Sequence, residues 1–211
     1  MPNFLAQLLT LAIIHLLAVM SPGPDFIMIT RNSIVYSRRA GKYSAVGLGL
    51  GILVHVFYSI VGIGLVISKS VLLFSIIKAI GAVYLVYIGY KSLTSKENGS
   101  KSLVNQEAKG DLTPGQAVKM GFITNVTNPK VTLFFLSIFT QVIDPGTPLS
   151  WQIVYGVEMS LVTMAWFVLV ATLFTHSAIK TRVAGIQHYA ERIMGGILIA
   201  LGIKLALTKA N

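Results

Sequence analysis

Long apolar stretches alternate with short polar segments along the chain. A bilayer core of about 30 Å is crossed by about 20 helical residues, and six stretches approach or exceed that length. They run over Phe4–Tyr36, Ala45–Ile67, Val71–Leu93, Gly115–Ile143, Trp151–Thr175 and Ile193–Leu207. The sixth is the shortest, and Gln187–Glu191 could extend it at the interface. The pattern predicts an all-α integral membrane protein with six transmembrane helices.

A polar segment separates the third stretch from the fourth. It runs from Ser95 to Asp111 and is rich in Gly, Ser, Asn and Lys, a composition typical of a linker. We expect one transmembrane domain over residues 1–211, divided into repeat one at 1–94, a cytoplasmic linker at 95–112 and repeat two at 113–211. Each half has three spans, an odd number, so equivalent spans cross the membrane in opposite directions. The sequence therefore predicts two inverted three-helix repeats.

The first and fourth stretches exceed one straight crossing, and both contain proline near the middle. The interruptions are Ser21-Pro22-Gly23-Pro24-Asp25 and Asn125-Val126-Thr127-Asn128-Pro129-Lys130. Interrupted helices at matching places in two halves indicate a transporter's binding site. We therefore expect both helices to be broken near the bilayer midplane and to cross there. An ordinary proline kink is the alternative for either break alone.

Proline removes a backbone donor from each break. It lacks an N–H and excludes the carbonyl four residues earlier, so we expect the carbonyls of Ala18, Met20 and Asn125 to lose their helical partners. Irregular backbone at this depth is stable only when it is buried in protein or lines a wet cavity. The breaks thus predict a polar site inside the membrane.

The residues that precede the prolines predict where each helix restarts. Such residues are pushed to extended geometry, so we expect Ser21, Gly23 and Asn128 to leave the helix. Gly23 or Ser21 would cap the second half of the first break, and Asn128 would cap that of the fourth stretch. Each break then offers carbonyls on one side and free N–H groups on the other, which suits a small zwitterion.

Composition and charge support a membrane protein. Of the 211 residues, 54% are hydrophobic, 11% are charged and none is cysteine. A soluble domain carries roughly 25% charge, so a soluble enzyme, a disordered chain and a disulfide scaffold are poor fits. The formal net charge of +10 comes largely from loops, and we interpret it as topology and contact with anionic lipid, with no nucleic-acid partner.

The loop charges predict the orientation. The loops after the first, third and fifth stretches carry most basic residues: Arg38, Arg39, Lys42, Lys96, Lys101, Lys109, Lys180, Arg182 and Arg192. The loop after the second has only Lys69, and the loop after the fourth has none. Because basic loops stay in the cytoplasm, we expect both termini outside.

Several motifs together resemble a known family. They are MSPGPDFIMITRNSIVYSRRAG (Met20–Gly41), GLGLGILVHVF (Gly47–Phe57), KAIGAVYLVYIGYKSL (Lys78–Leu93), GFITNVTNPKVTLFF (Gly121–Phe135), MAWF (Met164–Phe167) and GGILIALGIKL (Gly195–Leu205). In this order the chain resembles the lysine exporter / homoserine–threonine exporter (LysE/RhtB) family, closest to its threonine/homoserine efflux branch. The resemblance implies a multi-pass protein of the bacterial inner membrane, with periplasmic termini in this orientation. It also implies export of neutral, threonine- or homoserine-like amino acids by proton antiport, without a cofactor.

The resemblance and the breaks point to the same substrate-binding residues: Ser21, Pro22, Gly23, Pro24, Asp25, Asn125, Asn128, Pro129 and Lys130. We expect Asp25 to bind the substrate ammonium, and Lys130 with the Asn128 cap to bind its carboxylate. The alternatives are that Asp25 only complements a helix dipole and that Lys130 snorkels or pairs with a carboxylate.

Three residues are candidates for proton coupling: His55, Asp25 and Glu158. Histidine can titrate near neutral pH. His55 follows Gly47 and Gly51 at a spacing of four, so packing in a small-residue face is its alternative role. Glu158 is alternatively a charge at the cavity mouth. The glycine faces of the second and sixth spans could also support a homodimer.

Other functions fit less well. An exporter of another small solute or a metal ion remains an alternative, but His15, His176 and His188 show no ligand spacing, and we expect no metal site. We expect no enzyme and no catalytic residues, because no nucleophile–base motif is visible. A non-transporting scaffold in the membrane leaves the paired breaks unexplained.

Overall fold

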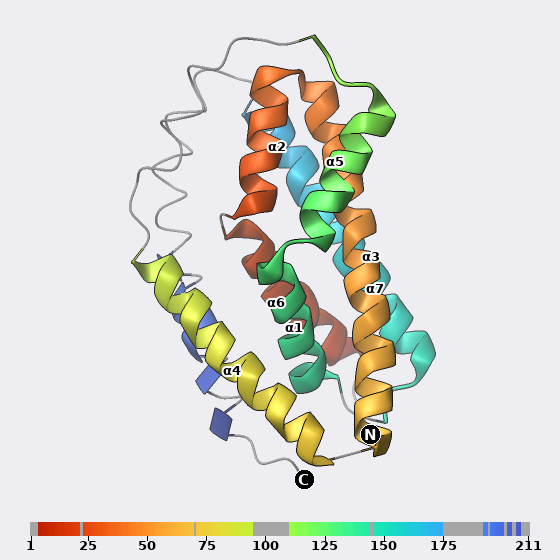
Figure 1. Cartoon of the computed structure of the whole chain (residues 1–211), viewed down its shortest axis with the longest axis vertical. Helices are drawn as coiled ribbons and strands as arrows, with labels where there is room; N and C mark the ends of the chain where they lie inside the picture. Colours follow the sequence, from red (N-terminus) through yellow and green to blue (C-terminus); the bar gives the residue numbers. More distant parts are fainter. Residues whose placement is uncertain are drawn as a thin grey trace.

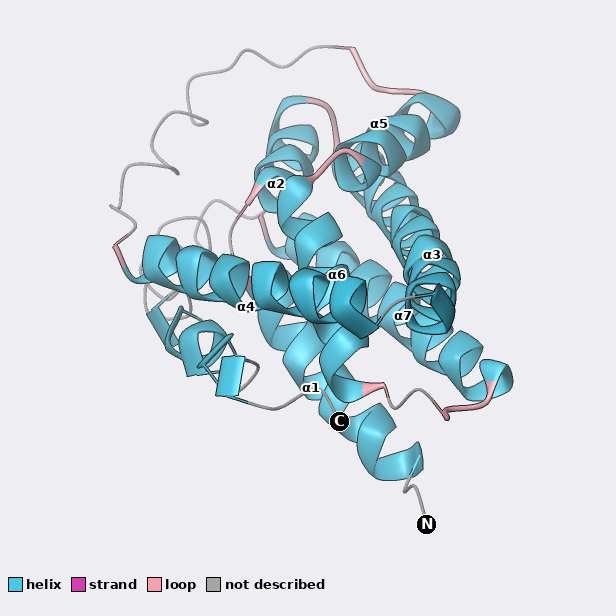
Figure 2. Cartoon of the chain, turned by 60° about the horizontal axis from the view of Figure 1, so that its bottom comes forward, coloured by secondary structure: helices cyan, strands magenta, loops and turns pink. Residues whose placement is uncertain are grey.

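The computed structural model describes residues 4–21, 23–69, 71–94, 110–143, 146–174, 192–193, 195–200, 202–203 and 206–207. Almost all of these are helical and none is in a strand (Figure 2). The helices are α1 (Phe4–Met20), α2 (Pro24–Val35), α3 (Arg38–Lys69), α4 (Val71–Leu93), α5 (Pro114–Val126), α6 (Pro129–Val142) and α7 (Leu149–Leu173). The all-α prediction is confirmed for this part of the chain.

The ends of the sequence-predicted elements mostly agree with the structure. The first and fourth stretches are divided into α1–α2 and α5–α6 at the predicted breaks. The second stretch differs, because α3 begins at Arg38 and not at Ala45. The Ser37 hydroxyl accepts from the Ala40 N–H at 3.0 Å, so the helix starts in the polar turn before the apolar run. Hydropathy located the apolar part of this helix and not its first turn.

The sixth stretch and the linker lie partly outside the described residues. The described residues between 192 and 207 are helical, in agreement with the prediction. Residues 95–109 of the expected linker are not described.

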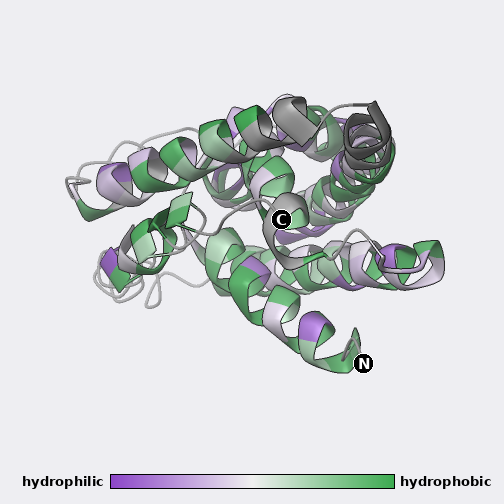
Figure 3. Ribbon diagram, turned by 90° about the horizontal axis from the view of Figure 1, so that it is seen from below, coloured by the Kyte–Doolittle hydropathy of each residue, from purple (hydrophilic) through white to green (hydrophobic). Residues whose placement is uncertain are grey.

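Length and hydropathy identify clear membrane spans among the described helices. Two helices are long and apolar enough to cross a bilayer, Arg38–Gly62 within α3 and Leu149–Leu173. The pair α1–α2, bent by 60° at the break, makes a third if it is counted as one span. Shorter apolar helices cover Ala79–Lys91 and Pro129–Phe139. Hydrophobic segments recur along the helices in Figure 3. The structure thus gives two to three clear spans, and the full six-span topology stays a prediction.

The two broken helix pairs run in opposite directions (Figure 1). The pair α1–α2 rises from the bottom of the view to the top, and the pair α5–α6 descends from the top. Helix α2 therefore contacts α5, and α1 contacts α6. Helices α3 and α7 pack together against these pairs, and α4 packs on α6. This arrangement brings the middles of the two pairs to the same level.

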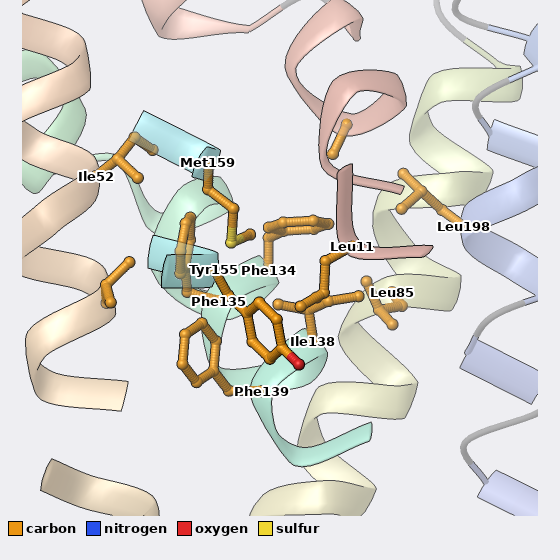
Figure 4. Packing of buried hydrophobic residues seen from close by; sticks show 12 residues of the cluster. Leu11, Ile52, Leu85, Phe134, Phe135, Ile138, Phe139, Tyr155, Met159 and Leu198 are labelled. Carbon is orange, nitrogen blue, oxygen red and sulfur yellow. The ribbon is translucent and has the colours of Figure 1, made fainter. Parts of the chain in front are cut away.

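Two apolar clusters lie on either side of that level. The first joins α1 and α6 with α7, and Figure 4 shows Phe135 and Phe139 of α6 beside Tyr155 of α7. The second joins α2 with α3 and α7 and includes Phe26 and Phe167. Burying one such side chain stabilises the fold by about 1.5–3 kcal/mol. The polar break residues are therefore enclosed between two apolar layers.

Small residues set the closest helix contacts. A Cβ at Gly47 would overlap the backbone of Val118 in α5, and one at Gly51 would overlap Asn125. The small-residue face predicted in the second span is confirmed. In the same way, Cβ atoms at Gly195 and Gly202 of the sixth stretch would meet α4. Both glycine faces are thus occupied within one chain, and a homodimer stays a prediction.

Candidate functional site

The first break follows from two local rules. Helix α1 ends at Met20, and α2 begins at Pro24 with Gly23 as its N-cap. Gly23 has φ −177° and ψ −169°, the extended geometry expected before proline. The Ala18 carbonyl accepts from the Ser21 N–H at 3.3 Å, so the prediction that this carbonyl loses a partner is wrong. A tighter turn at the end of α1 supplies the donor that proline removed.

The second break is capped by a side chain. Asn128 is the N-cap of α6 with φ −78° and ψ 108°, and its side-chain oxygen accepts from the Lys130 N–H at 3.0 Å. The Asn125 carbonyl is not free as expected, because it accepts from the Asn128 N–H at 2.9 Å and from His55 Nε2 at 3.0 Å. A histidine of α3 thus supplies a donor to the carbonyl that Pro129 leaves without its helical partner.

The two breaks meet at Asp25. Its Oδ2 accepts from Asn125 Nδ2 at 2.8 Å, and its Oδ1 accepts from Asn128 Nδ2 at 3.0 Å. All three side chains are buried. Hydrogen bonds to a charged group contribute about 1.5–3 kcal/mol each, so these two are a strong link between α2 and the second break. The acidic and amide residues singled out from the sequence are in direct contact.

Lys130 crosses from the second break to the first. Its Nζ donates to the Ser21 carbonyl at 2.8 Å, just past the end of α1. It also lies over Gly23, where a Cβ would be 3.6 Å from Nζ. The lysine thus places a cation on a carbonyl beside the C-terminus of a helix, where positive charge is favoured.

A cavity of about 50 Å³ opens on the two breaks. Break residues line it, including Ser21, Gly23, Asp25, Asn125, Asn128 and Lys130. The rest of the wall is mostly apolar, with Phe134 and Phe135 from α6. It also carries three polar side chains, His15, Tyr84 and Thr163. The arrangement can bind the polar part of a small molecule at the breaks and the rest of that molecule against the apolar wall.

The cavity residue His15 was missed as a site residue by sequence reasoning. Its Nε2 lies 3.0 Å from the Met159 carbonyl and 2.9 Å from Thr163 Oγ1, and its Nδ1 is buried with no partner among the described residues. A search for metal-ligand spacing could not find it. The signal that the sequence did offer for a site residue was its position six residues before Ser21, fewer than two helical turns from the first break.

His55 lies against the second break and does not line the cavity. Its Nδ1 is 2.7 Å from the Tyr58 hydroxyl, and the same hydroxyl is 3.4 Å from the Thr132 carbonyl, so it can donate to one or the other. Tyr58 was also missed, although it lies one turn after His55 on the same helix. The polar chain therefore runs from Tyr58 through His55 to the Asn125 carbonyl.

Glu158 is not brought to the breaks. It lies on α7, it does not line the cavity, and both carboxyl oxygens are buried without a partner among the described residues. Within the described part of the chain, no three His, Asp or Glu side chains are grouped to hold a metal ion. His176 and His188 lie outside the described residues.

The chain is similar over nearly its whole length to known membrane proteins of one family. The model of the family described as LysE type translocator matches residues 16–209. The uncharacterized membrane protein YrhP of Bacillus subtilis (strain 168) is 31% identical over 196 residues, which cover 90% of this chain and 93% of YrhP. The threonine efflux protein of Escherichia coli (strain K12) is 28% identical over 210 residues, covering 95% and 98%. That of Salmonella typhimurium is 28% identical over 205 residues, covering 95% and 97%. No solved structure matches.

Proposed function

Since the chain belongs to the family of LysE type translocators, it is a membrane transporter and not an enzyme, and we propose that it exports small neutral amino acids from the cytoplasm. Relatives that cover nearly the whole chain are named threonine efflux proteins, which supports an amino-acid cargo. Threonine- and homoserine-like amino acids are the cargo we propose. The observation that carries the proposal is the contact of the two breaks through Asp25 beside a cavity.

The proposed topology has six spans in two inverted repeats, at 1–94 and 113–211, joined by a cytoplasmic linker at 95–112. The opposite directions of α1–α2 and α5–α6 support it, as do their breaks at matching places. The basic loops support both termini on the outside of a bacterial inner membrane. Export would then proceed as the two repeats rock around the breaks.

Lys130 suggests how a zwitterion enters the site. In the structure its ammonium group is on the Ser21 carbonyl, a position that also suits the ammonium of an amino acid. We propose that the substrate ammonium takes this carbonyl together with Asp25, and that Lys130 turns to the substrate carboxylate. Asp25 accepts two amide hydrogen bonds, and a carboxylate has about four acceptor sites, so it retains capacity for an ammonium donor.

The carboxylate end of the substrate has a second source of attraction. Helices α2 and α6 both begin at the breaks, with proline in the first turn. The N-terminus of a helix favours negative charge by about 0.3–2 kcal/mol. The two helix starts and Lys130 therefore favour the carboxylate, while Asp25 and the Ser21 carbonyl favour the ammonium.

We propose His55 as the first of the three proton-coupling candidates, ahead of Asp25 and Glu158. Its Nε2 contacts a carbonyl and must carry hydrogen, so only Nδ1 can change its proton. A neutral ring accepts from the Tyr58 hydroxyl. A protonated ring donates to it, and that hydroxyl then turns to the Thr132 carbonyl. Because His55 also contacts Asn125, a proton gained here acts directly on the second break.

Reconstitution with labelled threonine tests the function. Wild-type protein in vesicles should give threonine counterflow, and Asp25→Ala and Lys130→Ala should each abolish it at unchanged membrane levels. Lys119→Ala is the matched control, because Lys119 is exposed on α5 and does not line the cavity. Normal counterflow by both site variants would overturn the binding mode. Absence of counterflow of any amino acid in the wild type would favour another small solute, a metal ion or a non-transporting role.

A further inference from the structure

His15 places a polar group on the wall of the cavity, on α1 before the first break. The ring is 1% exposed, and its neighbours include the rings of Phe134 and Phe135, whose centroids are both 5.8 Å away. Its Nδ1 has no partner among the described residues. A buried polar atom without a partner is costly and calls for an explanation. The cavity that His15 lines is where a missing partner could enter.

The contacts of Nε2 determine whether Nδ1 of His15 is a donor or an acceptor. Nε2 lies 3.0 Å from the Met159 carbonyl, which can only accept a hydrogen bond. Nε2 must therefore carry the hydrogen, and Thr163 Oγ1 at 2.9 Å is within reach of the same side of the ring. In a neutral imidazole the second nitrogen is then an acceptor. Nδ1 of His15 is thus a buried acceptor that lacks a donor.

We propose that His15 is a specificity-determining residue, whose Nδ1 accepts a hydrogen bond from a hydroxyl on the side chain of the transported amino acid. This inference rests on the proposed export of amino acids and adds to it how the cargo's side chain is recognised. An apolar side chain of the same shape leaves Nδ1 unpaired, so the site discriminates against it. Selection by an unpaired buried group is stronger than selection by one missing methyl group.

The cavity suits a cargo that contacts both its histidine and its break residues. His15 and Ser21 both line it, six residues apart in the sequence, so one small molecule can contact the His15 ring and the Ser21 carbonyl together. A hydroxylated amino acid offers an ammonium group for the carbonyl and a hydroxyl for the ring.

Threonine and valine test the proposal, because they have nearly the same shape and differ by one hydroxyl. We would measure kcat/KM for both in the same vesicles, for the wild type and for His15→Asn and His15→Gln. Asparagine can place its amide oxygen near the position of Nδ1. Glutamine can keep a donor near the position of Nε2 and offers no acceptor at Nδ1. The two variants therefore separate recognition from anchoring to α7.

The wild type and His15→Asn should prefer threonine by about tenfold, the value of one hydrogen bond to a buried acceptor. His15→Gln should reduce the ratio to about one and keep valine transport. His15→Phe serves as a second variant if His15→Gln does not reach the membrane. A purely structural role would lower both rates and leave their ratio unchanged, which would overturn the inference.

The outcomes distinguish a failure of this inference from a failure of the proposed function. A wild type that transports threonine and valine equally well, or a His15→Gln variant that retains the tenfold ratio, would refute the role of His15 and leave amino-acid export intact. A wild type that transports no amino acid would refute the proposed function, and the inference with it.

Discussion

An exchange of side chains between Asp25 and Asn128 probes the contact that joins the two breaks. In the native protein the Asn128 amide donates to the Asp25 carboxylate at 3.0 Å, and its oxygen accepts from the Lys130 N–H. Asn128→Asp places a second carboxylate against the first. The double variant Asp25→Asn with Asn128→Asp restores one carboxylate and one amide. Aspartate at residue 128 can still cap α6, so the cap is retained throughout.

The size of the effect follows from that distance. Two unit charges about 3.0 Å apart at an effective dielectric constant of about 20 repel by about 5 kcal/mol. Asp25→Asn alone should cost only about 1–2 kcal/mol, because the Asn125 amide can turn and offer its unpartnered oxygen to the new amide. The double variant should cost about 2 kcal/mol. The two substitutions should thus be coupled by about 3 kcal/mol or more, with the double variant more stable than Asn128→Asp.

Thermal unfolding of the four purified proteins measures this cycle. Asn128→Asp should lower the Tm by roughly 10–20 °C, since 1 kcal/mol corresponds to about 2–4 °C for a chain of this size. The double variant should recover most of that loss and regain threonine counterflow. Additive losses, with the double variant less stable than either single variant, would refute the contact and the reasoning built on it.

Two further predictions follow from the surroundings of Asn125. Gly51→Ala places a Cβ 2.6 Å from the Asn125 side-chain oxygen and should destabilise the protein by about 1–3 kcal/mol in thermal unfolding. Gly62→Ala on the same helix meets nothing within 4 Å and should be neutral or stabilising by up to about 1 kcal/mol, so equal effects would contradict the packing. Tyr58→Phe removes the hydroxyl that contacts His55 Nδ1. It should reduce proton-driven net export several-fold and leave threonine counterflow unchanged. Equal losses in both transport assays would argue against a role of this pair in proton coupling.

Much of the helical fold could be predicted from the sequence because it depends on neighbouring residues. The start of α2 at Pro24 and of α6 at Pro129 follows from the steric rules of proline. The Asn128 cap is also local, because its side-chain oxygen accepts from the Lys130 N–H only two residues later. The one clear difference in helix bounds, the earlier start of α3, arose because hydropathy reports the membrane environment and not the cap at Ser37.

The candidate site was predicted only in its membership. The sequence indicated Asp25, Asn125, Asn128 and Lys130 as one group, and the structure brings them into contact. The sequence did not indicate that the amides of Asn125 and Asn128 both donate to the Asp25 carboxylate, or that Lys130 reaches the Ser21 carbonyl. For His15 the sequence offered only its position shortly before the first break, because its partners Met159 and Thr163 lie on a helix far along the chain.

The sequence by itself determined where the helices break, which polar residues lie at the breaks, and that the chain belongs in a membrane. These properties depend on local sterics and on the transfer of apolar residues from water, which act within a few residues of each position. Only the tertiary structure decided the partners of Asp25, Lys130, His55 and His15. Apart from the contact of His55 with Tyr58 on the same helix, each of these hydrogen bonds joins residues more than fifty positions apart, so it depends on how the helices pack and not on local sequence.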